Sequence, residues 1–158
     1  KPILLGALHK LEGITAPALN KHKLKNMKND CEMVAIKNKI EFQWNIKFPI
    51  NSLYLMRGYL AIENEFKKKY FETCFDAYWK NNMDISNQEN VNKILEISGI
   101  NKDKFFDNIE DIKIKEELKQ LTDLAFKKNI FGAPTFIVNK KIFWGQDRLD
   151  YALDEYNS

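Results

Sequence analysis

Cysteine, histidine and arginine are scarce in this chain of 158 residues, each occurring only twice. The two cysteines, Cys31 and Cys74, are far apart, so no C-x-x-C pair is present and these residues encode no redox dithiol. Two histidines without ligand spacing give no support to a zinc site, and we expect no metal. No apolar run approaches the roughly 20 residues that cross a bilayer. Repeats and low-complexity linkers are absent as well.

The composition predicts one folded domain with a substantial core. Hydrophobic residues make up 44% of the chain and aromatic residues 13%, which suffices for a buried interior. The net charge of +3 is small, and lysines are mixed with acids throughout, so no nucleic-acid or membrane partner is expected. No segment has the pattern of a signal peptide, and we expect a cytoplasmic location; a chain that begins at Lys1 leaves targeting open.

Apolar spacing predicts mainly helices before residue 130. A strand is expected at Ile3–Leu8, and a short extended piece at Phe42–Phe48. Thr15 is a candidate cap for the first helix. The helices are expected at about 18–39, 52–61, 68–79, 86–98, 101–109 and 112–128.

The most informative stretch begins at Phe131 and predicts a strand entered through a proline. Thr135–Val138 is short, apolar and rich in β-formers, and Pro134 at its edge cannot donate to a sheet. Only X-Pro bonds adopt the cis form at low cost, so the Ala133–Pro134 bond is a candidate cis peptide. Such a bond would turn the N–H and C=O of Ala133 outward, where they could pair with an extended ligand.

A second strand and a helix start follow. Lys141–Trp144 is expected to pair antiparallel with the first strand, after a tight turn. Gly145 then opens a helix, with Asp147 suited to the N-cap or the first turn. Because a helix N-terminus favours anions, this start and the proline loop could face one small peptide-like ligand.

These motifs carry a family resemblance that spans the whole chain. Gly132-Ala-Pro-Thr135 is similar to the cis-proline loop of thioredoxin-fold proteins, and Trp144-Gly-Gln-Asp-Arg148 resembles a motif of the 2-hydroxychromene-2-carboxylate isomerases, relatives of the kappa-class glutathione transferases. Further segments resemble that family in the expected order: Lys1–Leu8 (the end of its second strand), Pro49–Leu53, Met56-Arg57 and Ala77–Trp79.

The resemblance implies an α/β fold of the DsbA and kappa type. Residues 1–15 and 111–158 would form a partial thioredoxin-like domain, and residues 16–110 an inserted all-helical subdomain. A thioredoxin-like sheet needs a central first strand, so we expect that strand and its helix to lie upstream of Lys1. The family's serine that activates the glutathione thiol begins that helix. No residue of this chain is therefore assigned a catalytic role.

The resemblance also implies glutathione as the cofactor and assigns its contacts. Ala133, beside Pro134, would pair with the cysteinyl backbone, and the backbone of Trp144 would line the site. Gln146 and the N–H of Gly145 would contact the glutamyl carboxylate. Asp147 would bind the glutamyl amine, although a plain helix cap is an equally good interpretation.

Substrate contacts are implied at Lys10, Asn51 and Arg57. Lys10 borders, with His9 and Lys23, a region that helps to hold the substrate carboxylate in the resembled enzymes. The ordinary alternatives are a solvated side chain for Lys10, a helix cap for Asn51 and a structural ion pair for Arg57. The same ion-pair alternative, with Asp147 or Asp150, holds for Arg148. Both cysteines are better interpreted as structural thiols.

The function implied by the resemblance is glutathione-dependent isomerisation of 2-hydroxychromene-2-carboxylate or a related aromatic catabolite. The resemblance also implies a homodimer. The alternatives are a DsbA-like thiol-disulfide oxidoreductase with its C-x-x-C upstream of Lys1, or a non-catalytic, truncated thioredoxin-fold domain. The residues upstream of Lys1 would distinguish these three functions. A serine there would indicate the isomerase, a C-x-x-C pair the oxidoreductase, and neither of them a non-catalytic domain.

Overall fold

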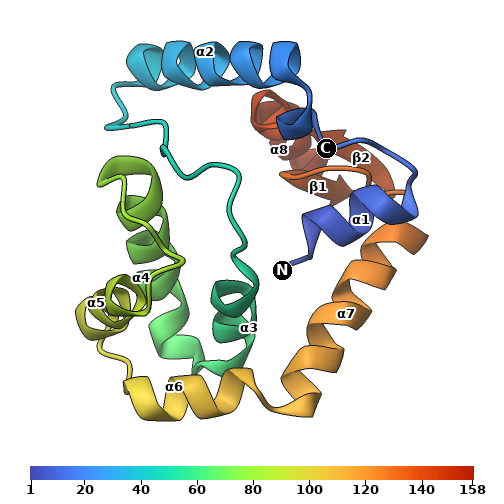
Figure 1. The fold of residues 1–158 in the computed structure, drawn as a ribbon. Helices are drawn as coiled ribbons and strands as arrows, with labels where there is room; N and C mark the ends of the chain where they lie inside the picture. The colour runs from blue at the N-terminus through green and yellow to red at the C-terminus, as the bar shows by residue number, and fades with distance from the viewer.

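The computed structural model describes residues 1–158 as eight α-helices, three short helical turns and one two-stranded sheet (Figure 1). The elements are α1 (Leu5–Leu11), η1 (Pro17–Leu19), α2 (Lys21–Asn38), α3 (Leu53–Ala61), α4 (Asn64–Phe75), the π-helical turn η2 (Asp76–Lys80), α5 (Gln88–Ser98), α6 (Lys102–Ile109), α7 (Ile112–Lys127), β1 (Thr135–Val138), β2 (Lys141–Trp144), η3 (Gln146–Arg148) and α8 (Leu149–Asn157). No helix combines the length and the apolar character that a membrane span requires.

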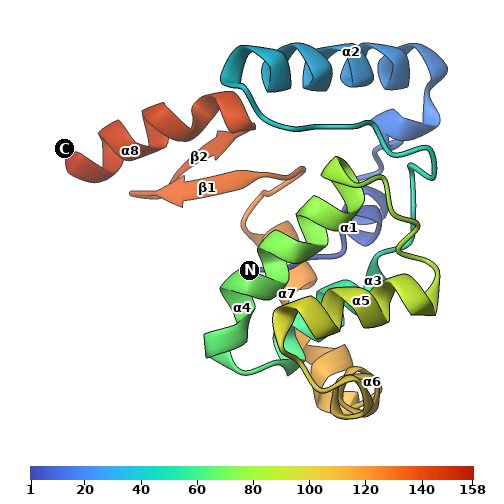
Figure 2. The same ribbon diagram turned by 90° about the vertical axis from the view of Figure 1, so that its left-hand side faces the viewer.

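The helices α3 to α6 surround the main hydrophobic core (Figure 2). Its ten buried residues all lie between residues 55 and 109: Leu55, Tyr70, Ala77, Tyr78, Ile85, Val91, Ile94, Leu95, Phe105 and Ile109. No strand lies between residues 16 and 110, where the helical insertion is predicted. The domain boundaries themselves stay a prediction.

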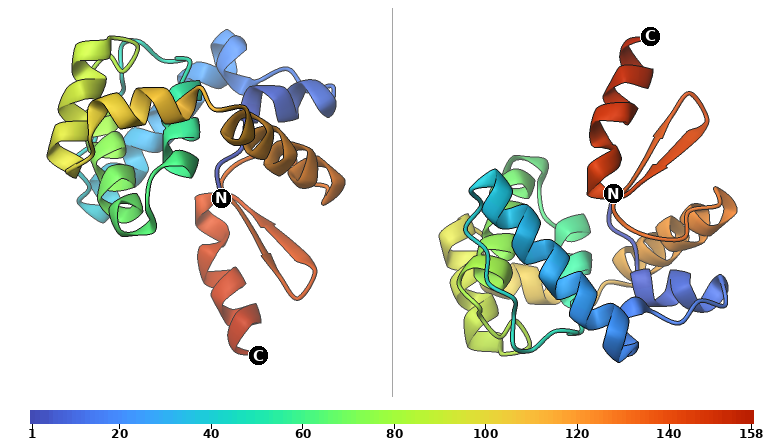
Figure 3. Two further views of the ribbon diagram at one scale, coloured as in Figure 1. Left: turned by 90° about the horizontal axis from the view of Figure 1, so that it is seen from below. Right: turned by 90° about the horizontal axis from the view of Figure 1, so that it is seen from above.

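The β-hairpin follows the sequence prediction. β1 and β2 pair antiparallel, with Thr135 opposite Trp144 and Val138 opposite Lys141. Asn139 and Lys140 form a two-residue turn in which both have positive φ, 48° and 67°, as tight hairpin turns require. The Ala133–Pro134 bond is cis, as predicted. Figure 3 shows that the hairpin and α8 project together, away from the bundle of α3 to α6.

The strand predicted at Ile3–Leu8 is wrong, because Leu5–Leu11 forms helix α1. Leu5, Leu8 and Leu11 are spaced three residues apart and suit one helical face. Leu8 is fully buried, and α1 packs against α7. Packing of that face outweighs the low helix propensity of Gly6.

Several helix starts also differ from the prediction. α2 is capped by Asn20, whose Oδ1 accepts the N–H groups of His22 and Lys23 at 3.1 Å each, and not by Thr15. The helix predicted at 68–79 begins at Asn64 and ends in the π-helical turn. Asn87 caps α5, one residue after the predicted Ser86. Asparagine is as favourable as serine at the N-cap of a helix, and it holds that position in both α2 and α5.

One buried polar side chain holds the segment between α2 and α3 to the bundle. Asn45 is fully buried, and its Nδ2 donates to the carbonyls of Tyr78 at 2.9 Å and Met83 at 3.0 Å. Its Oδ1 accepts the N–H of Lys47 at 2.8 Å. These bonds join the segment before α3 to the end of η2 and to the loop that follows it, and they satisfy the polar atoms of a fully buried side chain.

Thr122 holds the start of α1 to α7. Its Oγ1 accepts the N–H of Leu4 at 3.0 Å and donates to the carbonyl of Leu118 at 2.9 Å. We expect Thr122→Val to lower the free energy of unfolding by about 1–2 kcal/mol, because it leaves the Leu4 N–H without an acceptor. Urea denaturation would measure this. Thr122→Ser keeps the hydroxyl and is the control; equal losses in both variants would contradict the hydrogen-bond explanation.

Candidate functional site

The proline loop presents an exposed and unpaired piece of backbone. Ala133 is exposed, and its N–H and C=O make no hydrogen bond within the chain. The hydroxyl of Thr135 donates to the carbonyl of Gly132 at 2.7 Å and fixes the loop from inside. The free groups of Ala133 are therefore available to an extended ligand, as the sequence predicts.

A direct hydrogen bond joins this loop to the start of η3. The N–H of Gly145 donates to the carbonyl of Pro134 at 3.0 Å. This bond brings the predicted cofactor-binding segments 133–134 and 144–147 together. It also corrects the predicted role of the Gly145 N–H, which is engaged by Pro134. The N–H groups of Gln146 and Asp147, at the first two positions of η3, make no hydrogen bond and remain available to an anion.

The backbone conformation at position 145 favours glycine. Its φ of +111° lies in a region that residues with a side chain rarely adopt. A Cβ there would also lie 2.6 Å from Oδ1 of Asp147, so this carboxylate folds back over Gly145. The conformation at Gly145 thus sets the position of Asp147 at the helix start.

Asp147 lies in the first turn, as predicted, but makes no capping hydrogen bond. Its Oδ2 lies 3.2 Å from Nη1 of Arg148, and this pair is half-exposed. The Arg148 guanidinium also lies 5.4 Å from the ring centre of Tyr151. The ion-pair interpretation of Arg148 is therefore correct in this structure, and the exposed Asp147 carboxylate remains accessible to a cation.

Two aromatic rings border the loop, and one of them was not predicted. The indole of Trp144 covers Gly132 so closely that a Cβ on that glycine would overlap Nε1. Phe131 packs edge-to-face on this indole, with ring centres 5.1 Å apart. The side chain of Trp144, and not only its backbone, thus borders the site. The position of Phe131, directly before the proline motif, is the signal that could have identified it.

The predicted substrate residues are not joined to this loop by any hydrogen bond or ion pair. Lys10 is exposed on α1. Asn51 lies two residues before the first residue of α3, and its Oδ1 accepts the N–H of Leu53 at 3.0 Å; the N-cap position itself is held by Ser52, whose side chain makes no capping bond. Arg57 is 20% exposed in its side chain, and its Nη1 lies 3.5 Å from Oε1 of Glu110. Asn51 thus has a structural role at the start of α3, and Arg57 has a structural ion pair. Contact of either residue with substrate stays a prediction.

Neither cysteine has the environment of a reactive thiol. Burial raises the pKa of Cys74 to about 12, although a hydrogen bond with Tyr70 acts in the opposite direction. Burial and the nearby carboxylates of Asp30 and Glu32 raise the pKa of Cys31. Both thiols remain protonated at neutral pH, which agrees with the structural role predicted for them.

A carboxylate on α8 fixes the hairpin turn below the site. Oε2 of Glu155 accepts from Nζ of Lys141 at 2.5 Å, and Oε1 accepts from Nδ2 of Asn139 at 3.1 Å. The bond from Lys141 contributes most to lowering the pKa of Glu155 below its ordinary value of 4.5, followed by the bond from Asn139. The contact orients α8 against β1 and β2.

The lowered pKa of Glu155 predicts a pH dependence of stability. A carboxyl group with a depressed folded-state pKa stabilises the fold above its unfolded-state pKa, and this contribution is lost as the pH falls through the folded-state value. We expect Glu155→Gln to be less stable than the wild type at pH 7, with the difference disappearing in acid. Urea midpoints for both proteins between pH 7 and about pH 3 would measure it. A difference that persists at the acid end would contradict this origin.

Comparison with known proteins places the chain in a family. The family model described as the DSBA-like thioredoxin domain matches residues 1–157. The chain belongs to the DSBA-like thioredoxin domain family. The thioredoxin-like fold predicted from the sequence is thereby confirmed.

Two curated proteins and one solved structure are similar to this chain. A 2-hydroxychromene-2-carboxylate isomerase of Sphingobium xenophagum is 24% identical over 134 residues, which are 85% of this chain and 68% of that protein. The thiol:disulfide interchange protein DsbA of Pseudomonas syringae pv. tomato is 29% identical over 73 residues, 46% of this chain and 34% of that protein. A structure of selenomethionine 2-hydroxychromene-2-carboxylate isomerase superposes with a TM-score of 0.88 at 20% identity, covering 99% of this chain and 78% of that one.

Proposed function

We propose that this chain is part of a glutathione-dependent isomerase of 2-hydroxychromene-2-carboxylate or a related aromatic catabolite. The observation that carries the proposal is the bond between the Gly145 N–H and the Pro134 carbonyl, which joins the free backbone of Ala133 to the helix start at Asp147. The 24% identity to an isomerase over 85% of the chain supports an isomerase as the reaction class.

The chemical character of this site fits glutathione. Ala133 offers one N–H and one C=O to the peptide backbone of the cysteinyl residue. The free N–H groups of Gln146 and Asp147 suit the glutamyl carboxylate, and the Asp147 side chain suits the glutamyl ammonium. Glutathione bound here would supply the nucleophilic thiolate for the isomerisation.

The residues of this chain act by positioning. Pairing at Ala133 fixes the direction of an extended ligand along the outer side of the loop, and the contacts at η3 fix its other end. The indole of Trp144, with the ring of Phe131 packed on it, covers Gly132 and supports the loop from one side. Lys10, exposed on α1, is proposed to attract the substrate carboxylate, with Asn51 and Arg57 as the further proposed contacts.

A thiol-disulfide oxidoreductase is the second candidate. The match to a DsbA protein and the exposed backbone of Ala133, which would also suit an extended peptide, favour it. Within this chain neither Cys31 nor Cys74 suits such a reaction, because both thiols have raised pKa values. A C-x-x-C pair would have to come from outside these residues.

Two assays on the full-length protein distinguish the candidates. For an isomerase, we expect the absorbance of 2-hydroxychromene-2-carboxylate to relax to its equilibrium mixture only when both enzyme and glutathione are present. For an oxidoreductase, the protein would instead reduce the disulfides of insulin in the presence of dithiothreitol. Isomerisation without glutathione, or insulin reduction alone, would contradict the proposal; activity in neither assay would favour a non-catalytic domain.

A further inference from the structure

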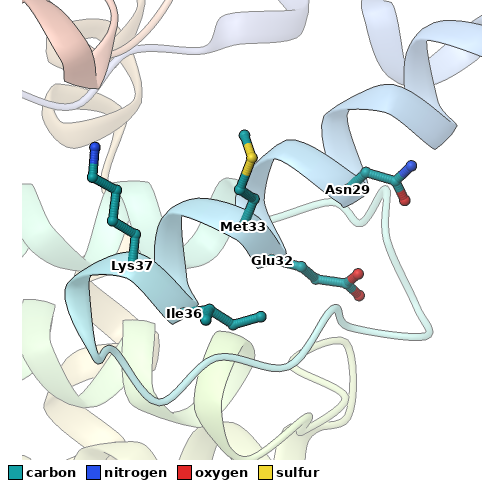
Figure 4. Close-up of a pocket in the computed structure, with 5 residues that line it drawn as sticks. All are labelled: Asn29, Glu32, Met33, Ile36 and Lys37. Atoms are coloured by element: carbon teal, nitrogen blue, oxygen red, sulfur yellow. The ribbon is translucent and has the colours of Figure 1, made fainter.

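Trp144 differs from other exposed apolar side chains of the chain, because it packs against the backbone of the proposed site. A shallow open groove on α2 is lined in part by exposed apolar side chains (Figure 4): Asn29, Glu32, Met33, Ile36 and Lys37. Scattered apolar side chains of that kind are normal on a protein surface. Trp144 is 52% exposed, and yet its indole covers Gly132, which is buried. A ring in this position can act on the loop beneath it.

Gly132 and Trp144 are fitted to one another. The φ of Gly132 is not in the positive range, so its backbone conformation does not by itself favour glycine. A Cβ on Gly132 would lie 3.1 Å from Cε2 and 3.2 Å from Cδ1 of the indole, and it would overlap Nε1. Glycine at position 132 therefore leaves room for the indole.

The register of the hairpin places the indole over the loop. Trp144 pairs with Thr135, so the two side chains lie on the same face of the sheet. The Thr135 hydroxyl donates to the Gly132 carbonyl at 2.7 Å. Phe131 packs edge-to-face on the indole, with ring centres 5.1 Å apart. Gly132 is therefore held through its carbonyl by Thr135 and across its Cα by Trp144.

We propose that Trp144 is a positioning residue, which holds the proline loop so that the N–H and C=O of Ala133 face the ligand. Ala133 is exposed and makes no hydrogen bond within the chain, so its orientation is set by the residues beside it, Gly132 and Pro134. Glycine has more conformational freedom than any other residue, and the indole restricts it before a ligand arrives. Less conformational entropy is then lost on binding. The inference rests on the proposed function in one respect, the pairing of glutathione with Ala133.

A tryptophan opposite Thr135 could also act by stabilising the hairpin alone. The two roles differ in what they predict for the folded protein without ligand. A residue that only stabilises the hairpin does not affect the order of the loop while the fold is intact. A positioning residue keeps the loop ordered within the intact fold. The backbone order of Ala133 in the ligand-free protein therefore distinguishes them.

Nitrogen-15 relaxation of the full-length, ligand-free protein measures this order. Trp144→Val keeps a β-former in the strand but removes the ring. The order parameter of the Ala133 N–H should fall from about 0.85, the value of rigid backbone, to below about 0.6. Ile142→Ala is the matched control, because Ile142 is 37% exposed on the same strand and pairs with Ile137, not with the loop. An Ala133 N–H that is mobile in the wild type, stays rigid in Trp144→Val, or loosens equally in Ile142→Ala would overturn the proposal.

Titration with glutathione measures the consequence for binding. Trp144→Val should raise the dissociation constant about tenfold, because roughly one residue of backbone must then be ordered on binding. Ile142→Ala should leave it unchanged. In the isomerase assay the KM for glutathione should rise with the dissociation constant while kcat stays the same, since bound glutathione orders the loop itself. Equal affinity in the wild type and Trp144→Val would contradict the positioning role. A wild type that binds no glutathione would instead contradict the proposed function, and the relaxation experiment would still decide the role of Trp144.

Gly132→Ala tests the fit between the two residues. Its Cβ should displace the indole and loosen Ala133 as Trp144→Val does. The double variant should be no looser than either single variant, because the same contact is lost only once. Additive losses of order and affinity in the double variant would show that Trp144 does not act through Gly132, and would refute the proposal.

Discussion

Replacement of Phe105 by alanine should lower the free energy of unfolding by about 3–5 kcal/mol. Phe105 is 2% exposed and lies at the centre of the helical core, with its ring centre 5.9 Å from that of Tyr70 and 5.5 Å from that of Phe106. Its ring fills the space above Gly58 so completely that a Cβ on that glycine would overlap it. Losing the ring removes buried apolar surface and leaves a cavity that rigid helices cannot close.

Urea denaturation followed by circular dichroism would measure this loss. Phe71→Ala is the matched control, because Phe71 lies on α4 of the same bundle but is 50% exposed. We expect its cost to be below about 1 kcal/mol. Similar losses in the two variants would show that the core described here does not dominate the stability of the bundle.

Asp147→Asn should weaken the binding of glutathione roughly ten- to a hundred-fold, because it removes one charge-assisted contact to the glutamyl ammonium. That change corresponds to about 1.5–3 kcal/mol. Asp147 is exposed and makes no capping bond, so the substitution should leave the fold intact. Its affinity for glutathione can therefore be compared directly with that of the wild type.

Asp150→Asn is the control for this variant. Asp150 is also exposed, in the first turn of α8, and has no assigned contact with the ligand. The net charge changes equally in both variants, so a general effect of charge would appear in both. Unchanged affinity in Asp147→Asn, or the same loss in Asp150→Asn, would show that the Asp147 carboxylate does not hold the ligand.

The parts of the fold that could be predicted from the sequence are those determined by neighbouring residues. The hairpin follows from Pro134, a short apolar strand and the turn at Asn139. The end of α5 follows from Gly99, whose φ is +74°. Ile3–Leu8 was misassigned because a short apolar run suits a strand and a buried helix face equally well.

Long-range polar contacts could not be predicted in this way. Asn45 bonds to carbonyls 33 and 38 residues away, and Thr122 accepts the N–H of a residue 118 positions earlier. The bond between Gly145 and Pro134 likewise depends on how η3 meets the hairpin. The family resemblance located the site residues, but only the structure shows which of their hydrogen-bonding groups are free.

Calorimetric titration of glutathione into the full-length protein tests the central claim most directly. The account predicts saturable binding of one glutathione per chain, in competition with peptides that pair with the backbone of Ala133. It also predicts that S-methylglutathione binds, because the contacts assigned to Ala133, Gln146 and Asp147 do not involve the thiol. Absence of any binding by the folded, full-length protein would contradict the glutathione site and the isomerase function that depends on it.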